Sequence, residues 1–194
     1  MNISKISNIV AGIRRYYRVS DTSLGILAAN LEERKYSKGH LLTRPGIKDH
    51  YVYFIEKGCT RTYLSVNGKE VTNWFSCEGD ITFSSTSFYY KKPAYEFVEV
   101  LENATIYAIS IETLEKLFET DIEFANWGRV IHQDVLFKMQ TLRLDRLNLT
   151  ANERYDKFCL ENPTLLNRVN LGYIASFLGI TQQYLSNLRG QNRF

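Results

Sequence analysis

Cysteine and histidine are scarce in this 194-residue sequence, and neither is clustered. The three cysteines, Cys59, Cys77 and Cys159, are odd in number and widely spaced, which argues against a disulfide framework and against a CxxC metal or redox site. The three histidines are equally scattered, without the HxH or HExxH spacing that brings two imidazoles to one metal ion. We therefore expect no metal site, and the sequence does not indicate a zinc or iron enzyme.

Long apolar runs are also absent. The uninterrupted runs are only a few residues long, and Lys5, Arg14, Arg15 and Arg18 separate the apolar residues of the opening stretch. Neither a membrane-spanning helix nor a cleavable signal peptide fits this pattern. Hydrophobic residues nevertheless make up 44% of the chain, which is ample for a packed core. We expect a folded cytoplasmic protein with no membrane partner.

The charge is balanced except near the carboxy-terminal end. Residues 1–138 contain 17 basic and 17 acidic side chains, whereas residues 139–194 contain 7 and 4. The whole net charge of +3 therefore lies in the last part of the sequence. A positive excess is the sign expected of a segment that contacts a polyanion.

The first two thirds of the sequence favour a mainly antiparallel sheet. Residues 3–31 have the apolar spacing of helices, and the pattern changes from Lys35 on. Segments rich in Val, Ile, Tyr, Phe and Thr then alternate with turns: YVYFIEKG, TRTYLSV, EVTNWFS, YEFVEVLE and TIYAISI. Asn67-Gly68 predicts a type I′ hairpin turn, which needs positive φ at both central positions. We expect about eight short strands in a barrel or jelly roll.

A helix is predicted at about 111–119, and a long helix follows over about 122–147, a stretch without proline. The apolar residues of the long helix lie on more than one side. One stripe consists of Ile131, Val135, Met139 and Leu142. The others lie elsewhere: Leu136, Phe137, Leu144 and Leu147. One face can cover the sheet while another meets a partner helix, so a homodimer is the economical interpretation. A helix buried wholly within its own monomer is the alternative.

Residues 171–190, LGYIASFLGITQQYLSNLRG, predict two short helices joined by a turn. Gly179 occupies the turn position where positive φ is inexpensive, and Thr181 is a good N-cap for the second helix. The spacing directs six positions inward, to a core shared by the two helices: Ile174, Ala175, Leu178, Ile180, Leu185 and Leu188. Ala175 is small where the two helices must cross closely.

The outward positions of the second helix carry amide, hydroxyl and guanidinium groups: Gln182, Gln183, Ser186, Asn187 and Arg189, flanked by Arg193. A merely solvated helix usually shows Glu and Lys, but this face has no acidic residue. Amides both donate and accept hydrogen bonds, as base edges require, and arginines suit phosphate or guanine. The pattern favours a DNA-reading helix. The alternative is a helical hairpin that only caps the sheet.

Several motifs, in this order along the chain, resemble the Crp/Fnr family of bacterial transcription regulators. YSKGHLLTRPG, VYFIEKGCTRTYL, NGKE and EGDI are similar to elements of its cyclic-nucleotide-binding β-roll. ANERYDKFCLENP and IASFLGITQQYLSNLR resemble the branch common in Bacteroidetes, whose helix-turn-helix pattern is Ile-Ala-x-x-Leu-Gly-Ile-Thr-x-x-x-Leu-Ser. The resemblance covers nearly the whole chain.

The resemblance implies an α+β fold in three parts. Residues 1–120 would form a sensor domain, an antiparallel double-stranded β-helix (jelly roll) with N-terminal helices. Residues 121–148 would form a long dimerisation helix, and residues 149–194 an all-α helix-turn-helix domain, which ends here without the wing of other members. A homodimer would bind double-stranded DNA, with Thr181 and the outward residues of the second helix in the major groove. Many relatives have Arg at the position of Asn187, so a different recognition sequence is expected. Contact with RNA polymerase is implied by the resemblance alone.

The sensor part departs from the cyclic-AMP receptors of this family. Their phosphate-binding cassette has a Gly-Glu pair and an Arg followed by Ser or Thr, but no Arg-Ser or Arg-Thr pair precedes Glu96 in CEGDITFSSTSFYYKKPAYEFVEV. We expect no cofactor, and an unidentified small-molecule effector, if any, in a pocket formed by Gly79, Asp80, Phe83, Lys91, Lys92 and Tyr95. The aromatic residues of this stretch equally suit a filled core. A true cyclic-AMP-responsive regulator stays open as an alternative.

A second alternative comes from a different class of protein, a cupin-like small-molecule-binding or enzyme domain with a helical appendage. It requires metal-ligating His and Glu on facing strands. His40 and His50 stand alone in the strand region. We therefore expect a regulator rather than an enzyme.

Overall fold

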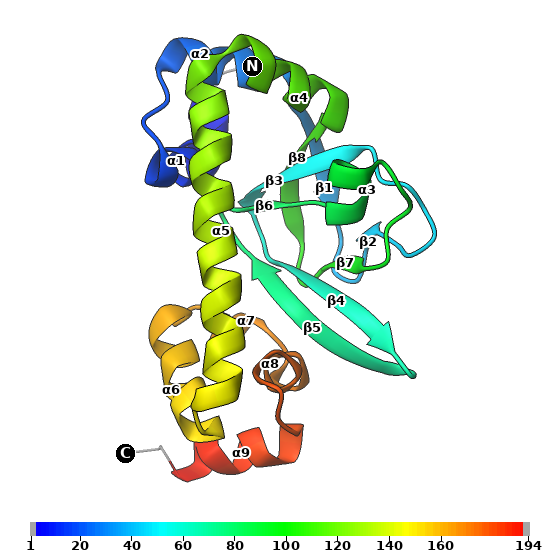
Figure 1. The fold of residues 1–194 in the computed structure, drawn as a ribbon, viewed down its shortest axis with the longest axis vertical. Helices are drawn as coiled ribbons and strands as arrows, with labels where there is room; N and C mark the ends of the chain where they lie inside the picture. Colours follow the sequence, from blue (N-terminus) through cyan, green and yellow to red (C-terminus); the bar gives the residue numbers. More distant parts are fainter. Residues whose placement is uncertain (1–2, 192–194) are drawn as a thin grey trace.

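The computed structural model describes residues 3–191, and its amino-terminal helices pack beside the sheets (Figure 1). A 3₁₀ helix, Ile3–Ile6, leads into α1 (Ser7–Tyr16), and α2 spans Asp21–Asn30. At the start of α1, the Glu56 carboxylate accepts hydrogen bonds from the backbone N–H groups of Asn8 and Ile9, each at 3.1 Å. A carboxylate is stabilising at this place because it faces the positive end of the helix dipole.

Two four-stranded antiparallel sheets follow, in the orders β1-β8-β3-β6 and β2-β7-β4-β5. Their strands are β1 (Glu32–Tyr36), β2 (Leu41–Thr43), β3 (Tyr51–Lys57), β4 (Thr60–Val66), β5 (Lys69–Ser76), β6 (Ile81–Thr82), β7 (Phe97–Val100) and β8 (Ala104–Ser110). The predicted antiparallel strands are confirmed, and they form the two sheets of a β-sandwich. A short helix, α3 (Ser85–Tyr90), lies between β6 and β7 and was not foreseen, because its aromatic run resembles a strand.

The β4–β5 hairpin has the turn that the sequence predicts. Asn67 and Gly68 have φ of 51° and 76°, and Val66 pairs with Lys69 across the turn. Asn tolerates the left-handed region better than most side chains, and Gly adopts it without strain. The hairpin lies alongside α8, and its turn points away from the carboxy-terminal helices (Figure 1).

The long helix α5 (Ile122–Asn148) follows α4 (Ile111–Thr120). The Asp121 carboxylate caps it by accepting hydrogen bonds from the N–H groups of Glu123 and Phe124 at 2.9 and 3.2 Å. The first half of α5 is buried in the core of its own chain through Phe124, Trp127 and Ile131. Its second half extends past the sheets to the carboxy-terminal helices (Figure 1).

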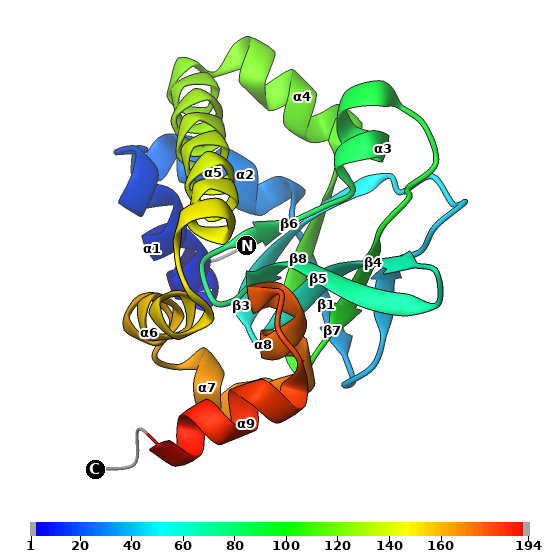
Figure 2. The same cartoon turned by 60° about the horizontal axis from the view of Figure 1, so that its bottom comes forward.

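The carboxy-terminal segment contains α6 (Ala151–Glu161), α7 (Leu165–Arg168), α8 (Leu171–Leu178) and α9 (Gln182–Gln191). Thr150 and Glu153 form a capping box at the start of α6. Gly179 ends α8 with φ of 70°, in the turn position that the sequence predicts. Figure 2 shows α8 against the β4–β5 hairpin and α9 at the outer end of the molecule.

Among residues 3–191, no helix combines the length and the apolar character needed to cross a membrane.

The turn Cys77–Asp80 lies directly against α1, which leaves no room for a side chain at Gly12. A Cβ built there would lie 1.8 Å from the carbonyl oxygen of Gly79. We expect Gly12→Ala to destabilise the fold by about 3 kcal/mol, because the added Cβ is fixed to the helix backbone and meets a backbone carbonyl, so neither group can rotate away. Urea unfolding measures this loss. The matched control is Gly25→Ala in α2, where a Cβ meets nothing within 4 Å. It should stabilise the protein by about 0.5–1 kcal/mol through helix propensity. Equal stability of Gly12→Ala and the parent would contradict the close approach.

Candidate functional site

The two helices of the predicted helix-turn-helix, α8 and α9, share a core. Five of the six residues predicted to face inward are buried, and Ile180 is half-buried; the five are Ile174, Ala175, Leu178, Leu185 and Leu188. The Thr181 hydroxyl accepts a hydrogen bond from the backbone N–H of Tyr184 at 3.2 Å, as an N-cap does. The packing therefore fixes which side of α9 faces outward.

The outward side of α9 is polar and open to solvent. The exposed side chains include the predicted base-reading residues Gln182, Gln183, Ser186 and Asn187, and also Tyr184, which sequence reasoning missed. Arg189 is half-buried, and Arg193 lies outside the described residues. The amides of Gln183 and Asn187 are 3.4 Å apart and so are held on one face of the helix.

The first helix, α8, is docked on the β4–β5 hairpin. The Ser176 hydroxyl donates to the carbonyl of Glu70 and accepts from the N–H of Thr72, both at 2.9 Å. The fully buried Arg61 guanidinium lies between two aromatic rings, 3.9 Å from the centroid of Tyr63 and 3.6 Å from that of Tyr173. We call this set of interactions the α8 docking contact. Local sequence patterns could not predict this contact, because the hairpin residues and the α8 residues that form it are more than 100 residues apart in sequence.

The charge of Arg61 is only partly compensated. It forms an ion pair with the half-exposed Glu70, and its Nε lies 3.9 Å from Glu99. Burial raises the pKa of Glu99, against the opposing effect of Arg61. The buried Nε and Nη1 atoms of Arg61 have no hydrogen-bond partner among the described residues, so the two tyrosine rings provide the main contact of the guanidinium.

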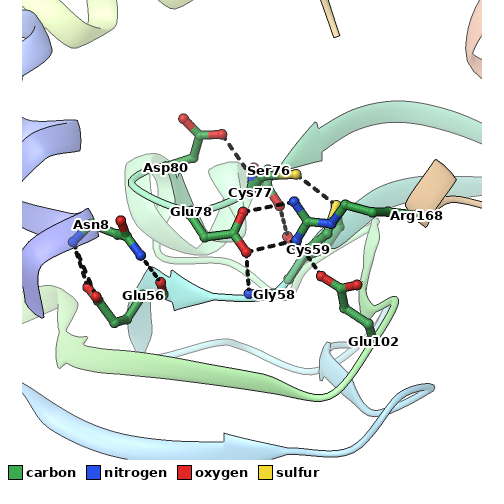
Figure 3. Close-up of polar contacts among 11 residues, drawn as sticks. Asn8, Glu56, Gly58, Cys59, Ser76, Cys77, Glu78, Asp80, Glu102 and Arg168 are labelled. Atoms are coloured by element: carbon green, nitrogen blue, oxygen red, sulfur yellow. Dashed lines mark hydrogen bonds and ion pairs between the residues drawn. The ribbon is translucent and has the colours of Figure 1, made fainter. Parts of the chain in front are cut away.

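A second link joins α7 to the sheets (Figure 3). Arg168 donates two hydrogen bonds to Glu78, at 2.8 and 2.9 Å, and another to Glu102. We call this set the Arg168 bridge. Burial on its own raises the pKa of Glu78, but the hydrogen bonds from Arg168 and from the N–H of Gly58 outweigh it and hold the pKa below its usual range.

A small cavity of about 210 Å³ lies between the hairpin, α3 and α5. The candidate pocket residues Phe83 and Tyr95 line it. Among the described residues, the full lining is Thr62, Leu64, Asn73, Trp74, Ser76, Ile81, Thr82, Phe83, Ser85, Tyr89, Tyr95, Glu96, Ile131, His132, Val135 and Met139. None of these is Lys or Arg. The buried Glu96 carboxylate accepts hydrogen bonds from the N–H groups of Ser85 and Tyr95, at 3.0 and 3.2 Å.

The other four candidate pocket residues do not line this cavity. Gly79 and Asp80 form the turn against α1, where Asp80 pairs with Arg15 at 3.0 Å. Lys91 pairs with Glu115 of α4, and Lys92 is exposed. The prediction grouped these residues with Phe83 and Tyr95 only because they are close to them in the sequence.

The long-helix residues divide between two surroundings. Ile131 is buried in the core of its own chain and Val135 packs against that core, so neither is free for a contact between subunits. Leu142 is half-buried and Met139 is exposed. The apolar side chains that face solvent on the second half of α5 are Leu136, Phe137, Met139, Leu144 and Leu147, with exposed fractions of 49–72%.

Within the part of the chain that the structure describes, no group of three or more His, Cys, Asp and Glu side chains is placed to hold a metal ion.

Residues 33–121 match the family model of the cyclic nucleotide-binding domain. A comparison with the curated proteins found no match. Over 83–89% of its length, the chain shares its fold with three solved structures.

The c-di-GMP-responsive global regulator CLP of Xanthomonas campestris is 14% identical, with a TM-score of 0.71 over 89% of this chain and 91% of that one. FixK2 of Bradyrhizobium japonicum is 21% identical, with a TM-score of 0.72 over 83% of each chain. A regulator of the Crp/Fnr family from Eubacterium rectale is 17% identical, with a TM-score of 0.69 over 89% of this chain and 83% of that one.

The Arg168 bridge generates a prediction about pH. Since the pKa of Glu78 is lowered in the folded state, the bridge stabilises above the unfolded value of about 4.3, and this contribution is lost as the pH falls through the folded value. Arg168→Met should cost about 1–3 kcal/mol at pH 7 and much less in acid. Urea unfolding at about pH 7 and at a pH below the lowered pKa of Glu78 tests this difference.

The control variant is Lys138→Met, which removes an exposed i,i+4 pair with Asp134. It should change the free energy of unfolding by less than about 0.5 kcal/mol. An equal loss for Arg168→Met at both pH values would mean that Arg168 stabilises by packing alone.

Proposed function

We propose that this protein is a dimeric, sequence-specific DNA-binding transcription regulator of the Crp/Fnr type. The observation that carries the proposal is the exposed, amide-rich face of α9, which has no acidic residue and is held by the α8–α9 core. Bidentate pairing of Gln or Asn with adenine requires such a face, and an α-helix fits the major groove. The regulators CLP and FixK2, with the same fold, support this assignment.

A homodimer is supported by the second half of α5. Five large apolar side chains on one helix are exposed in a single chain, and such a stripe is typical of a helix–helix interface. A groove of about 680 Å³ that includes Phe137 and Leu142 runs beside the same half of the helix. Pairing of two α5 helices would place two α9 helices for half-sites about 34–36 Å apart.

In this proposal residues 1–120 are the sensor, residues 121–148 the dimerisation helix and residues 149–194 the DNA-binding part. Contact with RNA polymerase and a cytoplasmic location follow from the proposed role and not from any contact in the structure.

The cavity of the sensor part does not suit a cyclic nucleotide. Arg and Lys are the usual partners of a phosphate, but the described lining has neither and contains the Glu96 carboxylate. That carboxylate already accepts the N–H of Ser85 at the start of α3. We infer that any effector in this cavity is uncharged or cationic and that DNA binding needs no cyclic nucleotide.

The first experiment selects genomic DNA fragments with the purified protein at moderate salt, with and without cyclic AMP. We expect one pseudo-palindromic sequence to be enriched equally in both arms, with affinity that falls steeply as salt rises. Enrichment only with cyclic AMP would restore the standard sensor. If neither arm enriches any sequence, the protein without a further effector does not bind DNA specifically, which contradicts the proposal for the free protein.

Two substitutions in α9 separate base reading from phosphate contact. Gln183→Ala should lose about 1–3 kcal/mol of discrimination at one base pair in each half-site. Arg189→Ala should weaken binding to all sequences alike and reduce the salt dependence. Fluorescence anisotropy with the selected site and with single-base variants measures both. The control is Gln133→Ala on α5, which should bind as the parent does. If all three variants bind as the parent, α9 does not read DNA.

A substitution in α5 tests the dimer. Phe137→Glu places a charge in the exposed apolar stripe, so we expect a monomer by light scattering at micromolar concentration and at least a tenfold loss of DNA affinity, about 1.4 kcal/mol. Val66→Glu at the tip of the hairpin is the control, since Val66 is also an exposed apolar residue. A parent protein that is already a strict monomer at this concentration would overturn the dimer.

A further inference from the structure

Two cysteines that are 18 residues apart in sequence lie side by side in the structure. Cys59 directly precedes β4 and Cys77 directly follows β5. The strands pair Thr60 with Ser76, so the two cysteines occupy the next opposed positions at the open end of the hairpin. Their Sγ atoms are 3.0 Å apart (Figure 3). That is about 1 Å longer than a disulfide bond, a distance that a small side-chain movement closes.

The two thiols differ in their surroundings. Cys59 is fully buried, in the same core as Leu101 and the carboxy-terminal helices. Its interaction with Cys77 and its burial raise the pKa of the Cys59 thiol. Cys77 is half-buried and reachable from solvent. The Arg168 guanidinium, which bonds to Glu78 next to Cys77, opposes this rise at Cys59 electrostatically. These surroundings assign the first reaction to Cys77 and the second to Cys59.

We propose that Cys59 and Cys77 form a reversible dithiol–disulfide site that small hydroperoxides, such as hydrogen peroxide, oxidise. The Cys77 thiolate attacks one peroxide oxygen, the O–O bond breaks, and the products are a sulfenic acid at Cys77 and hydroxide, which takes up a proton as water. The Cys59 sulfur then attacks the Cys77 sulfur, an S–S bond forms, and the sulfenic oxygen leaves as a second water. The two thiols lose two electrons and two protons, and the peroxide gains them.

The two cysteines lie where the sheets meet the carboxy-terminal helices. Glu78, which follows Cys77 directly, belongs to the Arg168 bridge, and Cys59 lies beneath the carboxy-terminal helices. A disulfide would therefore form at the junction between the sheets and the proposed DNA-binding part. The chemistry itself does not depend on the proposed function and is tested without DNA.

The experiment treats the native, reduced full chain with hydrogen peroxide, blocks free thiols with a maleimide after denaturation, and analyses tryptic peptides by mass spectrometry. Trypsin separates the three cysteines into residues 58–61, 70–91 and 158–168. We expect a cross-link between the first two peptides that dithiothreitol reverses, while Cys159 stays maleimide-labelled. A Cys159→Ser variant should give the same cross-link, and Cys77→Ser should give none.

Three results would overturn the proposal. One is sulfinic acid at Cys77 with a free thiol at Cys59, because disulfide formation by Cys59 would then be slower than further oxidation of the Cys77 sulfenic acid by peroxide. Another is a cross-link that involves Cys159. The third is a Cys59–Cys77 cross-link that forms only after the chain is unfolded, because the native geometry would then play no part. The native chain carries each of these tests, so none depends on whether a variant folds.

Discussion

The position of the proposed DNA-reading helix depends on one interaction, the α8 docking contact. A buried guanidinium is costly to desolvate, and Arg61 has few polar partners in return. The guanidinium contacts Tyr63 of the hairpin and Tyr173 of α8. These two contacts form together only when α8 is docked on the hairpin. Ser176 adds two hydrogen bonds to hairpin backbone in the same place. Since α9 packs on α8 through a shared core, fixing α8 also fixes the direction in which the amides of α9 point.

The long helix α5 serves two different environments along its length. Its first half is part of the core, where Phe124 and Trp127 pack with Phe54 of β3. Its second half has apolar residues that the single chain leaves exposed. Met139 lies between the two, since it lines the cavity and is also exposed. A helix of this kind connects the interior of the sensor part with the proposed subunit interface without any change in secondary structure.

Local patterns predicted the parts of this fold that local forces determine. Asn67-Gly68 specified its turn because few residues adopt positive φ, and Gly179 with Thr181 specified the α8–α9 junction for similar reasons. The six candidate pocket residues, by contrast, do not all line one cavity. Lys91 faces Glu115 and Asp80 faces Arg15, partners that only the tertiary fold brings near. The burial of Arg61 against α8 was not predicted either, because the side of the sheet on which a strand residue lies is known only once the strand register is known.

That register places the cavity and the α8 docking contact on opposite sides of one two-stranded ribbon. Side chains alternate along a strand, so Arg61 and Tyr63 of β4 face α8 while Thr62 and Leu64 line the cavity. The alternation is interrupted on β5 by a bulge, because Thr62 pairs with Trp74 while Tyr63 pairs with Thr72, and both Asn73 and Trp74 line the cavity. A molecule that filled the cavity would press on the same ribbon that holds α8. No separate relay of side chains is then needed, because the ribbon itself belongs to both the cavity and the α8 docking contact.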